Sequence, residues 1–329
     1  MSYTLAQVDA LTEDLLIQGV AEDVVKENPI LGMIPAENVT GKSVISNRES
    51  TTGSLAAWKT ATFTQIGGVL PESTPSTTQV TTSLAQLVDS AKVARFAIAV
   101  KGDVQTGGIE GFTHDEKIKA LFETFQDALM YGDNSSNSNE FSGLHKLVDN
   151  TLDTDLDITE GTNPLNISNL LQMSDAVRSP SVYVSNRRIR ARMAQAQYLG
   201  GTLGSATANN LNVNFGQQLD AFGTTPWTIS DFITQTETDA DPPVETGSSH
   251  SSVFALKLDD YTVMGPESTL YAKGPTLIQS AEGPHVVGPL PVTGESNVEF
   301  QYYWFVALIV PSRRTVGRIR GVTDAAVAA

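Results

Sequence analysis

The chain of 329 residues contains no cysteine. Disulfides, thiolate metal sites and a cysteine nucleophile are therefore excluded, and stability must come from packing and association. Charged residues are also scarce, at 18%, whereas 40% of the residues are hydrophobic, which excludes disorder throughout. A chain of this length can bury one large core or two modest ones, and we expect two lobes with shared strands.

Basic residues are few as well. The chain has 21 of them against 37 acidic residues, a formal net charge of -16, so nucleic acid and anionic membranes should repel it. We expect no sequence-specific nucleic-acid partner. Long hydrophobic runs are missing too, because the most apolar run, Tyr302 to Val310, falls far short of the roughly 20 residues that span a bilayer. Met1 to Ala10 lacks the features of a secretory signal, so we expect neither a membrane partner nor export by that route.

Catalytic and cofactor motifs are missing from the sequence. The histidines, at positions 114, 145, 250 and 285, lie far apart without the spacing of a metal site. There is no Gly-x-Ser-x-Gly elbow, no P-loop and no dinucleotide fingerprint. We therefore expect no enzyme activity, no metal and no cofactor.

One acidic run invites a calcium interpretation that fails. Asp153 to Asp157 alternates carboxylates as a calcium loop does, but Ile158 replaces the required glycine and Pro164 replaces the bidentate glutamate. The run instead predicts an edge strand with its Asp side chains outward and with Leu156 and Ile158 partly covered, and an adventitious cation site is the alternative.

The first 88 residues read as two extensions. A helical apolar spacing up to Val25, ended by Asn28-Pro29, predicts an amphipathic arm, which packs either on its own domain or on a neighbour. Gly41 to Val88 is rich in Thr, Ser, Gly and Gln, with β-prone pieces such as Trp58 to Ile66. It predicts either a long two-stranded excursion or a variable surface insertion, and we favour the excursion.

A long helix follows a strand. From Lys92 the pattern alternates as in a half-buried strand, and Thr113 to Glu116 forms a capping box that predicts a helix start. Apolar residues then follow one helical face for about 18 residues, and Gly132 suits a left-handed cap at the end.

The remainder reads as mixed α/β. Helices are predicted from Ile167 to Val177 and from Asn186 to Gln197, the second capped by Ser185 or Asn186, and a buried strand is predicted at Val182 to Val184. Further strands are expected at Trp227 to Phe232, Val253 to Met264 and Val298 to Val310, with an acidic loop from Thr236 to His250.

Arginines gather in two stretches. Arg178 to Arg192 holds five of the eleven and Arg313 to Arg320 holds four. Carboxylates on a neighbouring subunit would suit them, because guanidinium tolerates interface burial and pairs bidentately. A solvated face with intrachain pairs and contact with DNA phosphates are the alternatives.

Three segments carry a resemblance to a known family. The first runs from the strand at Asp89 to Val100 through the long helix to Asp127–Asp133 and Ser142-Gly143-Leu144. The second is Ser181 to Asn186, which leads into a helix. The third is Trp304 to Val310, followed by Arg313 to Gly321. In this order they resemble the major capsid proteins of tailed double-stranded-DNA bacteriophages, a fold also used by encapsulin nanocompartments and by the herpesvirus capsid floor.

The resemblance implies an α+β capsid fold with four parts. These are an N-terminal arm over 1–40, an extended β-hairpin loop over 41–88, a peripheral domain over 89–145 and 299–329 with a spine helix at 114–131, and an axial domain over 146–298. The loop would lie across the adjacent subunit. The candidate inter-subunit contacts are Trp58, Phe63, Arg187, Arg188, Arg190, Arg192, Arg313 and Arg314.

The implied function is that of a structural subunit. It would assemble into hexamers and pentamers of an icosahedral capsid around double-stranded DNA, in a virion formed in the host cytoplasm. Because the chain begins almost directly with the arm, we expect a separate scaffolding protein, with a portal and an optional decoration protein as further partners. An encapsulin-like cellular compartment is the alternative.

Overall fold

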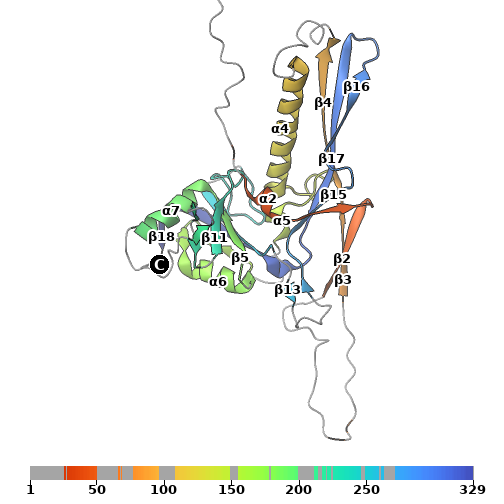
Figure 1. Ribbon diagram of the computed structural model, residues 1–329. Coiled ribbons are helices and arrows are strands. Elements are labelled where there is room, and N and C mark those ends of the chain that lie inside the picture. The colour runs from red at the N-terminus through yellow and green to blue at the C-terminus, as the bar shows by residue number, and fades with distance from the viewer. Residues whose placement is uncertain are drawn as a thin grey trace, which may run out of the picture.

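The computed structural model describes residues 26, 28–49, 66, 68, 77–95, 108–148, 155–177, 179–198, 211–213, 217–219, 221–223, 225–245, 249–258, 261–262 and 271–328. These residues form a long, slender sheet with one helix along it and a lobe attached near its base (Figure 1). Each part has a sheet of its own, and the end of the chain contributes a long strand to both.

The slender sheet has five strands. Its central strand is β17 (Asn297–Ile309), which pairs with β4 (Ala85–Ala94) on one side. On its other side, β17 pairs with β16 (His285–Pro291) and with β15 (Thr276–Ser280). The parallel edge strand β1 (Ala36–Val39) lies beside β15. Along β17, buried and half-buried residues alternate, because one face of the sheet is covered by the helix and the other is not.

The covering helix is α4 (Gly108–Tyr131), which runs beside β4 and β17 (Figure 1). Its Phe125 is fully buried and lies 4.3 Å, centroid to centroid, from the ring of Trp304 on β17. Phe122 approaches the same indole at 5.3 Å. These aromatic contacts hold helix and sheet together.

The lobe contains a seven-stranded sheet in the order β10 (Ala221–Phe222), β11 (Thr225–Ile229), β7 (Val182–Ser185), β12 (His250–Leu256), β18 (Val316–Ala328) and β5 (Asp157–Thr159), with β6 (Pro164–Asn166) also on β18. Helices α6 (Ile167–Val177) and α7 (Arg187–Tyr198) both pack against β18.

The lobe sheet is buried on both faces. Val253 and Ala255 of β12 pack with residues of α6 and α7, whereas Phe254 and Leu256 of the same strand pack into the core that α4 and β17 share. Successive side chains of a strand point to opposite faces, so this division shows that one face of the sheet meets the helices and the other meets the slender part.

Short elements complete the described structure: α2 (Ile30–Met33), α5 (Leu144–Leu147), the 3-10 turn at Arg313–Thr315, the hairpin of β2 (Ser43–Glu49) and β3 (Thr77–Ser83), and the pairs β8 (Leu211–Val213) with β9 (Gln217–Leu219) and β13 (Tyr261–Thr262) with β14 (Tyr271–Ala272). No helix in the described ranges is long and apolar enough to cross a membrane.

Several predicted elements are confirmed. The helix at Ile167–Val177, the buried strand at Val182–Ser185 and the long strand at Asn297–Ile309 lie where expected. The helix α7 is capped by Asn186, whose Oδ1 accepts from the amide of Arg188 at 2.9 Å. The paired β2 and β3 confirm the two-stranded base of the excursion.

The predicted start of the long helix is wrong. The helix begins at Gly108, so Thr113 and Glu116 lie inside it and form no capping box. Inside the helix, His114 Nδ1 lies 2.6 Å from Tyr302 Oη and Lys117 Nζ lies 3.1 Å from Asp89 Oδ2, so these turns are held against the sheet. Tertiary contacts of this kind override a local capping signal.

The left-handed cap predicted at Gly132 is also wrong, because this glycine has no positive φ. Its small size is needed for another reason. A Cβ on Gly132 would lie 2.4 Å from the carbonyl oxygen of Phe141, and one on Gly143 would lie 2.6 Å from that of Ala128. The amide of Gly143 donates to the carbonyl of Gly132 at 2.8 Å, so two backbone segments cross in direct contact at the end of α4.

The sheets divide the chain differently from the predicted domain boundaries. The predicted peripheral domain includes residues 299–329 as one piece, but β17 belongs to the slender sheet and β18 to the lobe sheet. The predicted axial domain, 146–298, includes β15 and β16, but both strands pair with β17 in the slender sheet. The predicted arm helix before residue 26 and the strand residues Phe96, Ile98 and Val100 lie outside the described residues.

Candidate assembly surfaces and a buried polar junction

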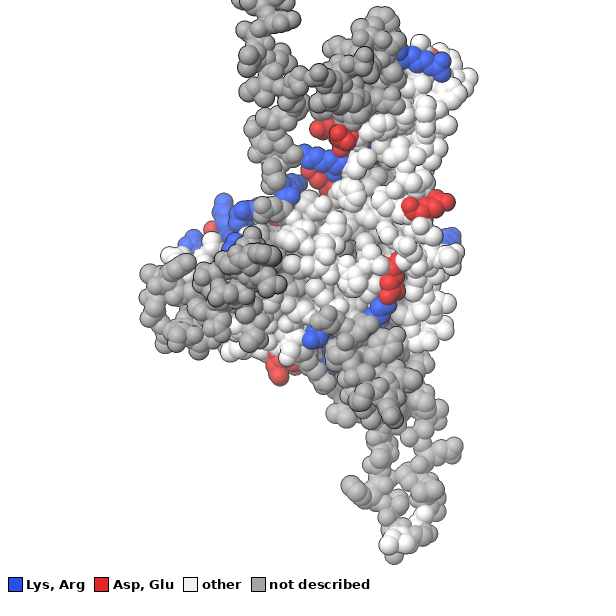
Figure 2. Space-filling view, in the orientation of Figure 1, with Lys and Arg blue, Asp and Glu red and all other residues white. Residues whose placement is uncertain are grey.

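The predicted arginine cluster lies on α7 at one edge of the lobe, where basic side chains gather (Figure 2). We call Arg187, Arg188, Arg190 and Arg192 the arginine face. Arg187 Nη2 lies 3.1 Å from Asp231 Oδ2, and Arg188 and Arg192 share the carboxylate of Asp324 at 3.5 and 2.7 Å. Side chains of Arg187 and Arg188 remain 56% and 63% exposed, so these are surface pairs of small energetic value.

The second arginine stretch is divided between surface and interior. Arg314 is exposed and Arg313 half-buried, both in the 3-10 turn before β18. Arg318 is fully buried and Arg320 nearly so, because alternate residues of β18 face the slender part of the molecule. Trp58 and Phe63, the predicted apolar anchors, lie outside the described residues.

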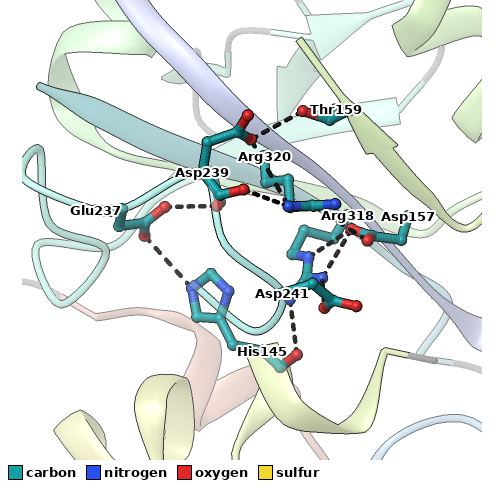
Figure 3. A network of polar contacts seen from close by, with 9 residues as sticks. His145, Asp157, Thr159, Glu237, Asp239, Asp241, Arg318 and Arg320 are labelled. Carbon is teal, nitrogen blue, oxygen red and sulfur yellow. Dashed lines mark hydrogen bonds and ion pairs between the residues drawn. The ribbon is translucent and has the colours of Figure 1, made fainter. Parts of the chain in front are cut away.

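Arg318 is the centre of a buried polar junction between the two parts (Figure 3). Its Nε donates to Asp157 Oδ1 at 2.8 Å, its Nη1 to the carbonyl of His145 at 2.7 Å and its Nη2 to Asp241 Oδ1 at 2.7 Å. One guanidinium thus joins β5, α5 and the acidic loop after β11. All its donor groups are directed at oxygen atoms, which is the condition under which a buried charge is tolerated.

The second arginine of the junction shares the same carboxylate. Arg320 Nε lies 3.1 Å from Asp157 Oδ2, and its Nη1 donates to the carbonyl of Asp239. Asp157 was predicted to point outward from an edge strand. The strand does lie at the edge of the sheet, but the Asp157 side chain is buried, because it balances two guanidinium groups at once.

Glu237 forms the other half of the junction and is completely buried. Its carboxylate accepts from Tyr131 Oη at 2.6 Å and from Ser252 Oγ at 2.5 Å, and it lies 3.4 Å from Nε2 of His145. The His145 ring stacks on Tyr131 at 4.8 Å between centroids and meets the edge of Phe254. The last residue of α4 is thereby tied to the loop and to β12.

Burial dominates the proton equilibria of the junction. Loss of hydration lowers the pKa of His145, against the opposing effect of Glu237, and raises the pKa of Tyr131 well above its ordinary value. His145 is therefore neutral and Tyr131 protonated at neutral pH, and Tyr131 acts as a hydrogen-bond donor. Among the described residues no cluster of His, Asp or Glu has the arrangement of a metal site.

Sequence reasoning missed the junction because its members are far apart in the chain. Arg318 and Asp157 are separated by 161 positions. One signal was present: Arg318 and Arg320 alternate with Gly317 and Ile319 in a strand, and buried arginines in that pattern require carboxylates on the same face. The acidic loop from Thr236 to His250 supplies them.

A third surface is the face of the slender sheet opposite α4. Val88, Tyr303 and His285 form one cross-strand row, and Val287 and Gln301 lie in the next. Val88 and Val287 are 48% and 39% exposed, and the His285 ring stacks on Tyr303 at 5.6 Å. These two rows are apolar, aromatic or uncharged polar, and Glu299 and Lys92 lie in the following row of the same face. Exposed apolar and aromatic side chains gathered on an open sheet face are typical of a contact surface.

No family model and no curated protein matches the sequence. Solved structures do match, over nearly the whole chain. The holo-SrpI encapsulin complex from Synechococcus elongatus aligns with 100% of this chain and 99% of its own at a TM-score of 0.62 and 11% identity. The capsid of cyanophage A-1(L) aligns with 95% of this chain and 99% of its own at a TM-score of 0.59 and 14% identity.

The chain has the capsid-shell fold. A further match, to the capsid of a native GTA particle, covers 97% of this chain and 100% of that one at a TM-score of 0.56 and 12% identity. The fold inferred from the sequence is thus confirmed, as is its α+β class. In terms of this capsid-shell fold, α4 is the predicted spine helix, and the hairpin of β2 and β3 is the base of the predicted extended loop.

Proposed function

We propose that this chain is the major capsid protein of a tailed double-stranded-DNA virus and self-associates into the hexamers and pentamers of a closed icosahedral shell. The observation that carries the proposal is the match to shell proteins over nearly the full length of both chains. Likeness of fold alone does not determine function, so the surfaces must supply the rest of the argument.

The surfaces support self-association. The chain offers a charged edge on α7, a sheet face with exposed apolar and aromatic side chains and an outward hairpin, and these lie on different sides of the molecule (Figure 1). Several separate contact surfaces are what a subunit needs when it has neighbours all around it. The net charge of -16 would keep unassembled subunits apart and soluble.

The remaining parts of the proposal concern partners and chemistry. We propose a structural role without enzyme activity or cofactor, assembly in the host cytoplasm with a separate scaffolding protein and a portal, and an optional decoration protein. Trp58 and Phe63 would anchor the extended loop on an adjacent subunit, and the arginine face with Arg313 and Arg314 would contact neighbouring carboxylates. Packaged DNA would be only the contents of the shell.

A cellular nanocompartment is the second candidate. It is favoured by the encapsulin match, which covers all of this chain at a TM-score of 0.62. The two candidates differ in what the shell encloses, since a virion holds nuclease-protected DNA and a compartment holds protein.

Electron microscopy of the purified protein tests the shared claim. Closed shells or capsomer rings are expected, alone or with a co-expressed scaffolding protein; a dispersed monomer under both conditions would contradict it. Particles from the native source, treated with nuclease and then opened, test the distinction. Protected double-stranded DNA supports the virus, and an enclosed protein without DNA supports the compartment.

A further inference from the structure

Two edges of the lobe carry opposite charge. The arginine face follows the exposed side of α7, and α6 lies at a different edge of the same lobe (Figure 1), where acidic side chains are seen in Figure 2. Because Arg188 and Arg192 share the single carboxylate of Asp324, they carry more positive charge than the pairing neutralises. A face with excess positive charge on a chain of net charge -16 requires an acidic partner surface.

The α6 edge carries an exposed leucine among carboxylates. Leu171 is 56% exposed, the most exposed large apolar side chain among the described side chains of α6 and α7. Asp175 lies one helical turn further on the same face. Asp155 is held at this helix by a hydrogen bond from Nε2 of Gln172, the residue after Leu171, to its Oδ1 at 2.9 Å. Both carboxylates are on exposed residues, and Asp175 has no ion-pair partner among the described residues.

The arginine face has a position that matches Leu171 and its carboxylates. Ala191 is exposed and lies within one turn of Arg187, Arg188 and Arg192, so the helix has a shallow, small-residue position bordered by guanidinium groups. A leucine rimmed by carboxylates and an alanine rimmed by arginines are complementary in both shape and charge. Central apolar contacts enclosed by charged groups are the usual plan of an energetically important contact.

We propose that the α6 edge of one copy docks on the arginine face of a second copy, with Leu171 over Ala191 and with Asp155 and Asp175 facing Arg188 and Arg192. This inference rests on the proposed shell function and specifies one contact within it. The two surfaces differ, so the contact is head-to-tail and repeats around an axis until a ring closes. It therefore belongs within a capsomer, and a two-fold contact between capsomers would need a different surface.

The absence of cysteine makes a direct test possible. In the double variant Leu171→Cys with Ala191→Cys, mild oxidation of assembled particles should link neighbours in a ladder that ends at the size of the closed ring, read on a non-reducing gel. The Cα atoms must come within roughly 7 Å for such a bond. Each single variant serves as a control and should remain monomeric, because a head-to-tail contact never brings two copies of one position together.

Charge reversal provides the second test. Arg188→Glu with Arg192→Glu should reduce the assembled fraction by about tenfold or more, because like charges then face one another. Asp155→Arg with Asp175→Arg should do the same, and the variant carrying all four changes should assemble again. Asp324→Asn is the matched control for the intrachain pairing: it leaves the arginine face charged and should assemble as the parent protein does.

The outcomes separate this contact from the proposed function. Shells that form without a disulfide ladder, or that tolerate the reversed arginines, would overturn the docking and leave the shell function standing. Equal losses in Asp324→Asn and in the arginine reversal would show an intrachain role and also overturn it. Failure of the unaltered chain to assemble under any condition would remove both proposals.

Discussion

Replacing Arg318 with Met removes the guanidinium that joins three elements at the junction, and we expect a large loss of stability. The side chain is fully buried and donates to Asp157, to the carbonyl of His145 and to Asp241 at 2.7 to 2.8 Å. Methionine fills similar space without a charge, so the effect isolates the polar interactions from simple loss of volume.

The expected magnitude follows from what the substitution leaves behind. Removing one member of a buried ion pair costs about 3 to 5 kcal/mol, mostly because the other charge is left uncompensated. Asp157 keeps its contact with Arg320 at 3.1 Å, so the lower part of that range, roughly 3 kcal/mol, is expected. The matched control is Arg187→Met, which loses the same atoms from a 56% exposed ion pair and should cost at most about 1 kcal/mol.

Urea unfolding of the unassembled subunit measures both variants, with the difference in free energy taken from midpoint and slope. The double variant Arg318→Met with Asp157→Asn should lose less than the two single losses added together, because it removes the orphaned charge. If Arg318→Met unfolds within about 0.5 kcal/mol of Arg187→Met, the junction does not hold the two parts together as argued.

Three smaller predictions concern the same region. Tyr131→Phe removes a donor to the buried carboxylate of Glu237 and should cost about 1 to 3 kcal/mol, measured by urea unfolding. Gly143→Ala forces a methyl group to within 2.6 Å of the carbonyl oxygen of Ala128 and should cost about 1 to 3 kcal/mol, with loss of protection from hydrogen exchange at the end of α4 as the signature. Burial keeps the pKa of His145 below its ordinary 6.5, so as the pH falls the unfolded chain binds a proton that the folded chain does not. The free energy of unfolding should therefore be at its full value above this pH and decrease as the pH drops below it. His145→Gln should reduce this decrease, measured by urea unfolding between about pH 7.5 and pH 5.5.

Local patterns predicted the elements whose packing is local. The apolar spacing of Ile167 to Val177 and the alternation from Val298 onward gave elements within a residue of those observed. The cap at Asn186 was found because its hydrogen bond spans two residues.

The sequence did not predict features that depend on distant partners. Asp157 was predicted to point outward because charges on an edge strand discourage unwanted pairing, whereas its two arginines follow more than 160 positions later. The observed start of α4 lies before the local capping signal, and the contacts of His114 and Lys117 with strands of the slender sheet have no counterpart in the local sequence pattern. The arginine face was predicted as a cluster, but the division of the second stretch into an exposed Arg314 and a buried Arg318 requires the sheet to be known.

The positions of β17 and β18 have a consequence for synthesis of the subunit. β17 is the central strand of one sheet and β18 pairs with β12 and β5 in the other, so strands made early, such as β4 and β5, have no main partner until the last part of the chain leaves the ribosome. Pairing over such separations is slow and leaves open strand edges in the meantime. In the assembly proposed above, a nascent chain would thus lack finished contact surfaces, and only completed subunits would join it.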